Sequence, residues 1–182
     1  MSLTTDRAID VRGAGPAPVA RLGRRARRAV LTVHILGAGA WIGIDVVLGV
    51  LVFTAMLTSS TATEALSYRA LELFAVWPLL AAGLVTLASG IALGLGTKYG
   101  LVRYWWVSMK LVLNVVLVVL VAFALRPGLA EAAAYGEVLA AGGSARSDVG
   151  SLVFPPVVSG VALVTATVLS VFKPWGRLRR QQ

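Results

Sequence analysis

Long apolar stretches alternate with short polar ones along this chain, and the pattern predicts four membrane-spanning helices. The apolar stretches cover residues 30–57, 70–95, 104–125 and 152–172. Each approaches or exceeds the roughly 20 residues that a helix needs to cross a hydrocarbon core about 30 Å thick. Backbone in lipid must satisfy its own hydrogen bonds, and the alternating pattern of barrel strands is missing. We therefore predict an all-α membrane protein, a four-transmembrane-helix bundle.

The segments between and beyond these stretches are short. Residues 1–28 are rich in Gly, Pro and Ala, end in a basic run, and are predicted to be a disordered tail. The apolar run that follows is too long for a signal peptide, so we expect a retained helix. The outer loop at 127–151 is the largest connection, and within it GLAEAAAYGEVLAA is predicted to form a short surface helix. A second basic tail covers residues 173–182.

The basic residues predict the orientation. Thirteen of the 17 Lys and Arg residues lie in the N-terminal tail, the loop between the second and third spans, and the C-terminal tail: Arg7, Arg12, Arg21, Arg24, Arg25, Arg27, Arg28, Lys98, Arg103, Lys173, Arg177, Arg179 and Arg180. Most acidic residues fall on the opposite side. The positive-inside rule then places both termini in the cytoplasm, N-in/C-in, in a bacterial cell (inner) membrane.

Composition narrows the class of protein. Hydrophobic residues make up 58% of the 182 residues and charged residues 14%, whereas soluble domains carry about 25% charged residues. Without cysteine there is no disulfide or thiolate metal site. The net charge of +9 follows from the topology, so we expect no nucleic-acid partner. No nucleotide-binding, metalloprotease or hydrolase motif occurs, and we expect no enzymatic activity.

Small residues and prolines within the spans bear on packing. Gly39 and Gly43 have GxxxG spacing, as do Gly90 and Gly94, and such pairs let helices approach closely in lipid. Two interpretations remain open. The glycines pack within one four-helix bundle, or they form a face for a homo-oligomer or a larger membrane complex.

Polar residues inside the spans are the candidates for function, because ionisable groups are costly in lipid. His34, Trp41 and Asp45 fall close to one face of the first span, and Lys110 and Asn114 share a face of the third. A polar path along the bundle is predicted from these residues together with Glu72 near the outer end of the second span. It would serve a small solute, a proton or a metal ion.

A purely structural interpretation accounts for most of these residues. Lys110 can extend its amine toward the headgroups, Glu72 can pair with Arg69, and His34 can bond a backbone carbonyl. Asp45 has no such explanation, and a carboxylate at its depth must be protonated, paired or hydrated.

Cofactor binding has little support in the sequence. His34 is the only histidine, whereas bis-histidine haem ligation needs two. His34 and Met109 are the weak candidates for a metal or haem site, and no cofactor is predicted, although haem and copper stay as alternatives.

Three segments carry a resemblance to a known family. LTVHILGAGAWIGIDVV at 31–47 is similar to the opening of the copper-resistance D (CopD)-like superfamily, and TKYGLVRYWWVSMKLVLN at 97–114 resembles its lysine-bearing helix. LSVFKPWGR at 169–177 looks like the end of an uncharacterised four-span branch from high-GC Gram-positive bacteria. The resemblance implies a four-helix architecture with His34, Trp41 and Lys110 in corresponding positions, but no established substrate. Besides a path through the bundle, an accessory subunit of a larger complex and a haem-binding redox protein remain alternative functions.

Overall fold

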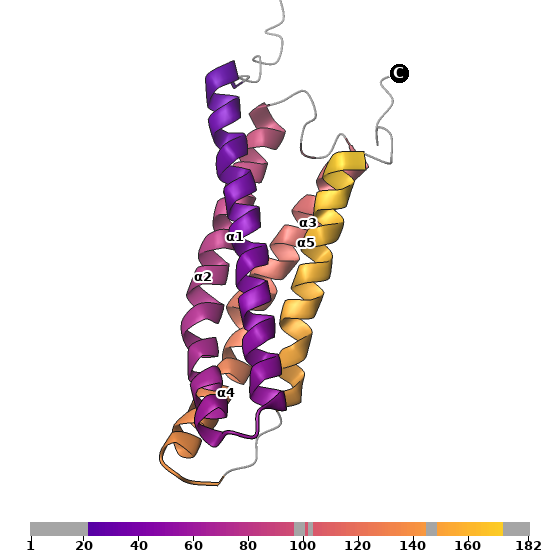
Figure 1. The fold of residues 1–182 in the computed structure, drawn as a ribbon. Coiled ribbons are helices and arrows are strands. Elements are labelled where there is room, and N and C mark those ends of the chain that lie inside the picture. The colour runs from indigo at the N-terminus through magenta and orange to yellow at the C-terminus, as the bar shows by residue number, and fades with distance from the viewer. Residues whose placement is uncertain (1–21, 97–100, 102–103, 145–148, 173–182) are drawn as a thin grey trace, which may run out of the picture.

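Four long helices run side by side in the computed structural model, which describes residues 22–96, 101, 104–144 and 149–172 (Figure 1). The elements in chain order are α1 (Arg24–Leu57), α2 (Thr61–Gly96), α3 (Trp105–Val119), the π-helical turn η1 (Leu120–Ala124), α4 (Leu125–Ala140), the 3-10 turn η2 (Val149–Val153) and α5 (Phe154–Phe172). The third long helix is formed by α3, η1 and α4 together.

These helices confirm the predicted all-α four-helix bundle. Within the described residues, four helices are long and apolar enough to cross a membrane: Arg24–Leu57, Thr61–Gly96, Trp105–Ala140 and Gly150–Phe172. The 34 residues of α1 extend about 50 Å at roughly 1.5 Å per residue, well beyond a hydrocarbon core of about 30 Å. α1 is therefore longer than the core is thick, and the four helices together are those of a multi-pass membrane protein.

Helix α1 begins earlier than the sequence predicted. Arg24–Arg28, which we assigned to the disordered tail, already belong to α1. Arginine and alanine are good helix formers, and extending an existing helix avoids the cost of nucleation. The remaining parts of the two predicted tails, residues 1–21 and 173–182, lie outside the described residues.

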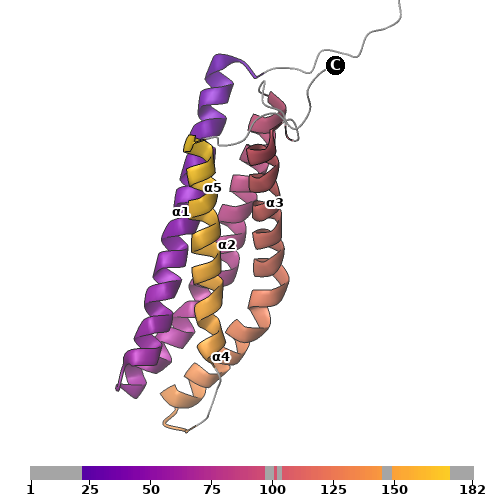
Figure 2. The ribbon, with the colours of Figure 1, turned by 90° about the vertical axis from the view of Figure 1, so that its right-hand side faces the viewer.

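The short helix predicted within the outer loop is present, but it continues the third span. Residues 125–140 form α4, which follows α3 through the π turn. The alanine-rich sequence favours helix, and Leu129, Ala132 and Gly136 are buried. A Cβ at Gly136 would lie 3.1 Å from the Ala65 carbonyl oxygen, which shows how closely α4 packs on α2. Figure 2 shows the change of direction between α3 and α4, as expected near a π turn and Pro127.

Glycine allows α1 and α2 to pack closely. A Cβ at Gly83 would lie 2.6 Å from Trp41 Cζ3, and one at Gly37 would lie 2.8 Å from Thr86 Oγ1. The indole of Trp41 is completely buried at this contact. Val118 of α3 reaches the same place, since its Cγ2 would lie 2.9 Å from a Cβ at Gly83. Three helices thus meet around one tryptophan.

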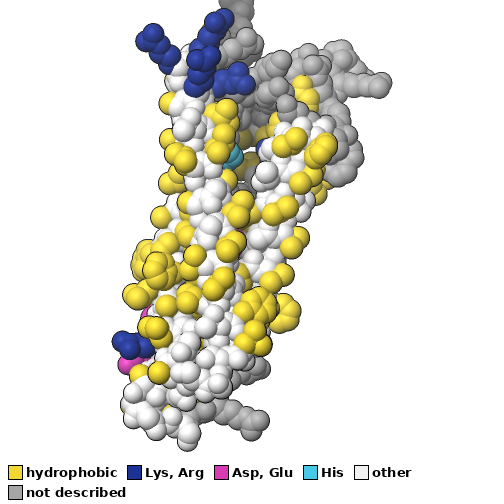
Figure 3. Space-filling model, in the orientation of Figure 1, with side chains coloured by type: hydrophobic (Ala, Val, Ile, Leu, Met, Phe, Trp, Pro, Cys, Tyr) yellow, Lys and Arg dark blue, Asp and Glu magenta, His cyan; other side chains and the backbone are white. Residues whose placement is uncertain are grey.

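The outer surface of the bundle is mostly apolar, as Figure 3 shows by the yellow side chains along its length. Gly39 and Gly43 belong to this outer surface, because both are exposed and no atom lies within 4 Å of a Cβ built on either. They therefore do not pack within the bundle. Gly90 does, against the ring of His34.

The contact between Trp41 and Gly83 leads to a first prediction. Gly83→Ala should lower the free energy of unfolding by about 1–3 kcal/mol, because the added methyl overlaps the indole. Thermal unfolding in detergent, followed by circular dichroism, measures the effect as a lower Tm. Gly39→Ala is the matched control and should not lower the Tm, since its methyl meets open space. Equal Tm values for the two variants would contradict this account of the packing.

Candidate functional site

The two ends of the bundle differ in charge, and we name them accordingly. α1 begins and α5 ends at the same end, at the top of Figure 1. Arg24, Arg25, Arg27 and Arg28 are exposed there, and Figure 3 shows basic side chains gathered at this end. We call it the basic end, and the opposite end, where α1 connects to α2, the far end.

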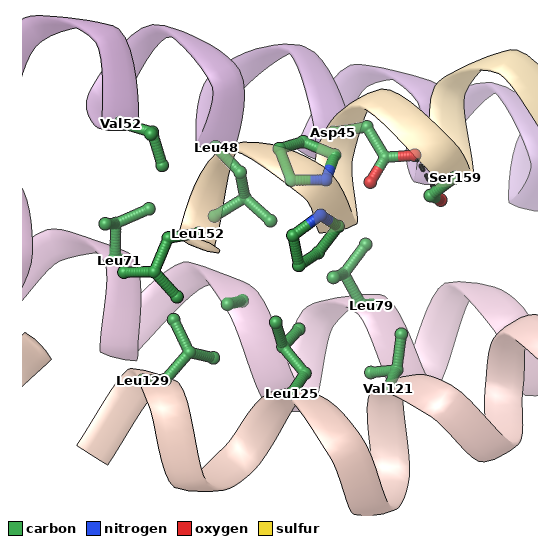
Figure 4. Close-up of a pocket in the computed structure, with 13 residues that line it drawn as sticks. Asp45, Leu48, Val52, Leu71, Leu79, Val121, Leu125, Leu129, Leu152 and Ser159 are labelled. Carbon is green, nitrogen blue, oxygen red and sulfur yellow. Dashed lines mark hydrogen bonds between the residues drawn. The ribbon is translucent and has the colours of Figure 1, made fainter. Parts of the chain in front are cut away.

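Asp45 lies inside the bundle and contacts a second helix. Its side chain is only 5% exposed, and its Oδ2 accepts a hydrogen bond of 2.6 Å from the Ser159 hydroxyl of α5. A hydrogen bond to a carboxylate is worth about 1.5–3 kcal/mol, which offsets part of the cost of burying the group. Figure 4 shows this bond as a dashed line, while the other carboxylate oxygen points into the space between the helices.

That space is a narrow cavity of about 30 Å³. A water molecule needs roughly 10–15 Å³ on the same measure, so the cavity has room for one or two. Its wall consists of Asp45, Leu48, Val52, Leu71, Ala75, Leu79, Val121, Leu125, Leu129, Leu152, Pro155, Pro156 and Ser159. Asp45 is the only ionisable residue among them. Because the wall on α1 extends from Asp45 to Val52, the cavity reaches about 10 Å toward the far end.

Two prolines in the cavity wall change the hydrogen bonding of α5. Pro155 and Pro156 lie in its first turn, where a missing N–H costs little. The carbonyl of Leu152 is affected most, since its partners three and four residues on are these two prolines, and neither has an N–H to donate. Leu152 itself lines the cavity and is buried.

His34 forms a second polar contact nearer the basic end. Its Nδ1 lies 3.0 Å from the Thr86 carbonyl oxygen and 3.0 Å from Ser89 Oγ. The Ser89 hydroxyl donates to the Val85 carbonyl at 2.6 Å, so we assign the ring proton to Nδ1 as the donor. Gly90 leaves room for the ring, because a Cβ there would lie 3.2 Å from His34 Cε1. The carbonyl contact predicted as a structural explanation for His34 is therefore present.

Lys110 completes this second group from the other side of the bundle. Its Nζ donates a 2.8 Å hydrogen bond to Ser170 Oγ of α5 and lies 4.7 Å from the centre of the Trp106 ring. It is also close enough to His34 for an electrostatic interaction. We call His34, Ser89, Lys110 and Ser170, one residue from each long helix, the polar layer.

Trp41 and Asn114 lie between Asp45 and the polar layer. Trp41 is one helical turn from Asp45, and Asn114 is one turn from Lys110. Trp41 Nε1 and Asn114 Oδ1 are buried and have no hydrogen-bond partner among the described residues. Buried polar atoms are rarely left unpaired in proteins, and an unpaired one commonly marks the position of a bound water or ion.

Glu72 does not belong to the interior, contrary to the prediction. Its side chain is exposed on α2, whereas the neighbouring Leu71 lines the cavity. One residue turns a helix by about 100°, so adjacent side chains face different surroundings. Arg69 also differs from expectation, because its Nε lies 2.8 Å from Glu137 Oε1 of α4. This ion pair joins α2 to α4 at the surface of the far end.

The predicted metal ligands do not form a cluster with acidic groups. No group of three or more His, Asp or Glu side chains that could hold a metal is found in the described part of the chain. Met109 is half-buried on α3, next to Lys110 in sequence, and so faces a different direction from the Lys110 side chain.

The serines that pair with the candidate residues were not predicted as site residues. Ser159 and Ser170 were expected to supply small surfaces and weak interhelical hydrogen bonds, which the structure has, and Ser89 was not singled out. Their depth in the membrane is the signal that could have identified them. In antiparallel helices, the depth of a residue follows from its distance in sequence from the helix ends, so serines at the depth of Asp45, His34 or Lys110 can be found. Which helices are neighbours, however, requires the structure.

Comparisons of the chain with protein-family models, with curated proteins and with solved structures found no match. The resemblance to the copper-resistance D-like superfamily thus stays a prediction.

The bond between Asp45 and Ser159 leads to a second prediction. Asp45→Leu and Ser159→Ala, measured singly and together, should show a coupling free energy of about 1–2 kcal/mol, because each change alone removes the same hydrogen bond. Thermal unfolding of the four proteins in detergent gives the coupling. The matched control is the same cycle with Thr165→Ala in place of Ser159→Ala. Thr165 also lies on α5, but its hydroxyl bonds a carbonyl of its own helix, so its effect should add to that of Asp45→Leu. Additive effects for Asp45 and Ser159 would contradict a direct interaction.

Proposed function

We propose that this chain lets a small cation cross a membrane through its bundle, with Asp45 as the central binding group. The observation that carries the proposal is a buried carboxylate at the end of an apolar cavity, bonded to a single hydroxyl. A buried ionisable group in a membrane helix is a functional candidate by default, because its cost must be balanced by a use or by full pairing. Asp45 is only partly paired, since one oxygen points into the cavity (Figure 4).

The arrangement along the bundle supports a path with two polar positions, Asp45 with Ser159 and the polar layer. Starting from the far end, the cavity leads to Asp45 and Ser159, then come Trp41 and Asn114, and then the polar layer near the basic end. His34 and Asp45 are 11 residues apart, about 16 Å along α1. The polar groups and the cavity together therefore extend over about 25 Å along the bundle, which is most of the thickness of a hydrocarbon core.

A flux measurement tests this function. Purified protein in liposomes should dissipate a membrane potential set by potassium and valinomycin when a permeant cation is present, as followed with a potential-sensitive dye. Asp45→Asn should slow this dissipation at least tenfold, because the amide keeps the shape and loses the exchangeable charge.

The matched control is Glu72→Gln, which neutralises an exposed acid of the same bundle and should keep the rate of the unmodified protein. Identical rates for the unmodified protein and Asp45→Asn would refute the proposed function.

We further propose that the basic end faces the cytoplasm of a bacterial cell, as the charge distribution predicts. The chain contains no cysteine, so a single cysteine can be labelled selectively. On intact spheroplasts, a membrane-impermeant maleimide should label Ser59→Cys in the exposed connection at the far end. Gln182→Cys should react only after permeabilisation. The reverse pattern would show the opposite orientation.

A further inference from the structure

Three features of the interior bear on which cation the bundle accepts: the number of ligands around Asp45, the packing of Trp41, and the two buried polar atoms, on Trp41 and Asn114, that have no partner among the described residues. The proposed function does not say which cation is accepted. Together they discriminate between a metal ion and a proton.

The ligands around Asp45 are too few for a metal ion. The cavity wall offers one carboxylate and the Ser159 hydroxyl, whereas all other wall side chains are apolar. Hard cations such as Ca²⁺ take six to eight oxygen ligands, and Mg²⁺ takes six, keeping several waters. A space of about 30 Å³ cannot hold that shell. A proton needs only one carboxylate oxygen and a water to exchange with.

Trp41 closes the axis between Asp45 and the polar layer. Its side chain is 0% exposed, and its ring packs so closely on Gly83 that a Cβ there would overlap it. Val118 covers the same position from α3. No hydrated ion can pass this point without moving the indole. The positive charge of Lys110 on the basic-end side of Trp41 adds a barrier to metal cations.

One of the two unpaired atoms belongs to Trp41 itself, and the other lies on α3, one turn from Val118 toward the basic end. Trp41 Nε1 is a donor and Asn114 Oδ1 an acceptor, and both are buried. A water bonded to either atom would add a hydrogen-bonding group between the polar layer and Asp45. A chain of such groups carries protons and excludes larger ions.

Resting on the proposed function, we infer that the species crossing this bundle is the proton, and that Trp41 is the residue that restricts the path to it. The Asp45 carboxylate takes a proton from a hydronium ion on one side, forming one O–H bond as an O–H bond of the hydronium breaks and leaves water. When the indole moves, the carboxylic acid gives the proton to a water on the other side, which becomes hydronium, in the reverse exchange. Charge and atoms balance, and no other reactant is needed.

Ion-selective flux measurements test this inference. Full-length protein is placed in liposomes loaded with pyranine for protons or with a sodium-sensitive dye, and a potential is set with potassium and valinomycin. The unmodified protein should acidify the interior without sodium entry. Trp41→Ala should raise proton flux at least tenfold and admit sodium, because the closure is removed. Trp77→Ala, at a 72% exposed tryptophan, should behave like the unmodified protein.

Trp41→Phe is a second variant for the case that Trp41→Ala does not fold. Phenylalanine keeps most of the ring and loses the N–H donor, so sodium should stay excluded while proton flux falls severalfold. Sodium entry through the unmodified protein that depends on Asp45 would overturn the proton assignment and leave the proposed function standing. Absence of any Asp45-dependent cation flux would refute both. Proton-only flux that neither Trp41 variant changes would overturn the role of Trp41.

Discussion

The close approach of α1 and α2 determines where the polar groups of this protein lie. Gly37, Gly83 and Gly90 remove the side chains that would hold the two helices apart, and the space goes to Trp41 and His34. Once Trp41 is placed against Gly83, the spacing along α1 puts Asp45 one turn farther, facing α5 and the cavity. Side chains of ordinary size at the glycines would turn the same sequence pattern into a bundle with a wider and emptier interior.

Lipid makes unpaired polar groups costly, and the bundle meets that constraint with small hydroxyl groups on neighbouring helices. The hydroxyl of Ser159 is hydrogen-bonded to Asp45, that of Ser89 to His34 and that of Ser170 to Lys110. Each hydroxyl also has a backbone carbonyl or a charged group within reach, so a serine supplies a partner without adding charge. The groups left over, Trp41 Nε1 and Asn114 Oδ1, are buried and have no partner among the described residues. The packing that stabilises the fold and the chemistry that suggests a path thus involve the same few residues.

Hydropathy predicted the number and class of the helices, because long apolar runs report directly on lipid exposure. The alanine-rich stretch of α4 was expected to be helical but was placed on the outer surface, whereas the structure joins it to the third span and buries Leu129 and Ala132. Asp45, His34 and Lys110 were identified from their cost in lipid alone. Glu72 was misplaced because facing inward or outward depends on helix rotation, and the serine partners depend on which helices are neighbours. Neither is encoded in a local pattern.

The π turn η1 has a consequence for how this chain can vary. A π turn holds one more residue than the α-helical turn it replaces, and Val121 and Leu125, at and just after it, both line the cavity. Deleting a single residue from 120–124 would therefore restore a regular α-helical turn and leave the residues of α4 on the faces they occupy now. A deletion in the regular part of α3 would instead rotate everything after it by about 100°, taking Leu129 out of the cavity wall and Glu137 away from Arg69. The π turn is thus the place in the third long helix where the loss of one residue preserves the interior.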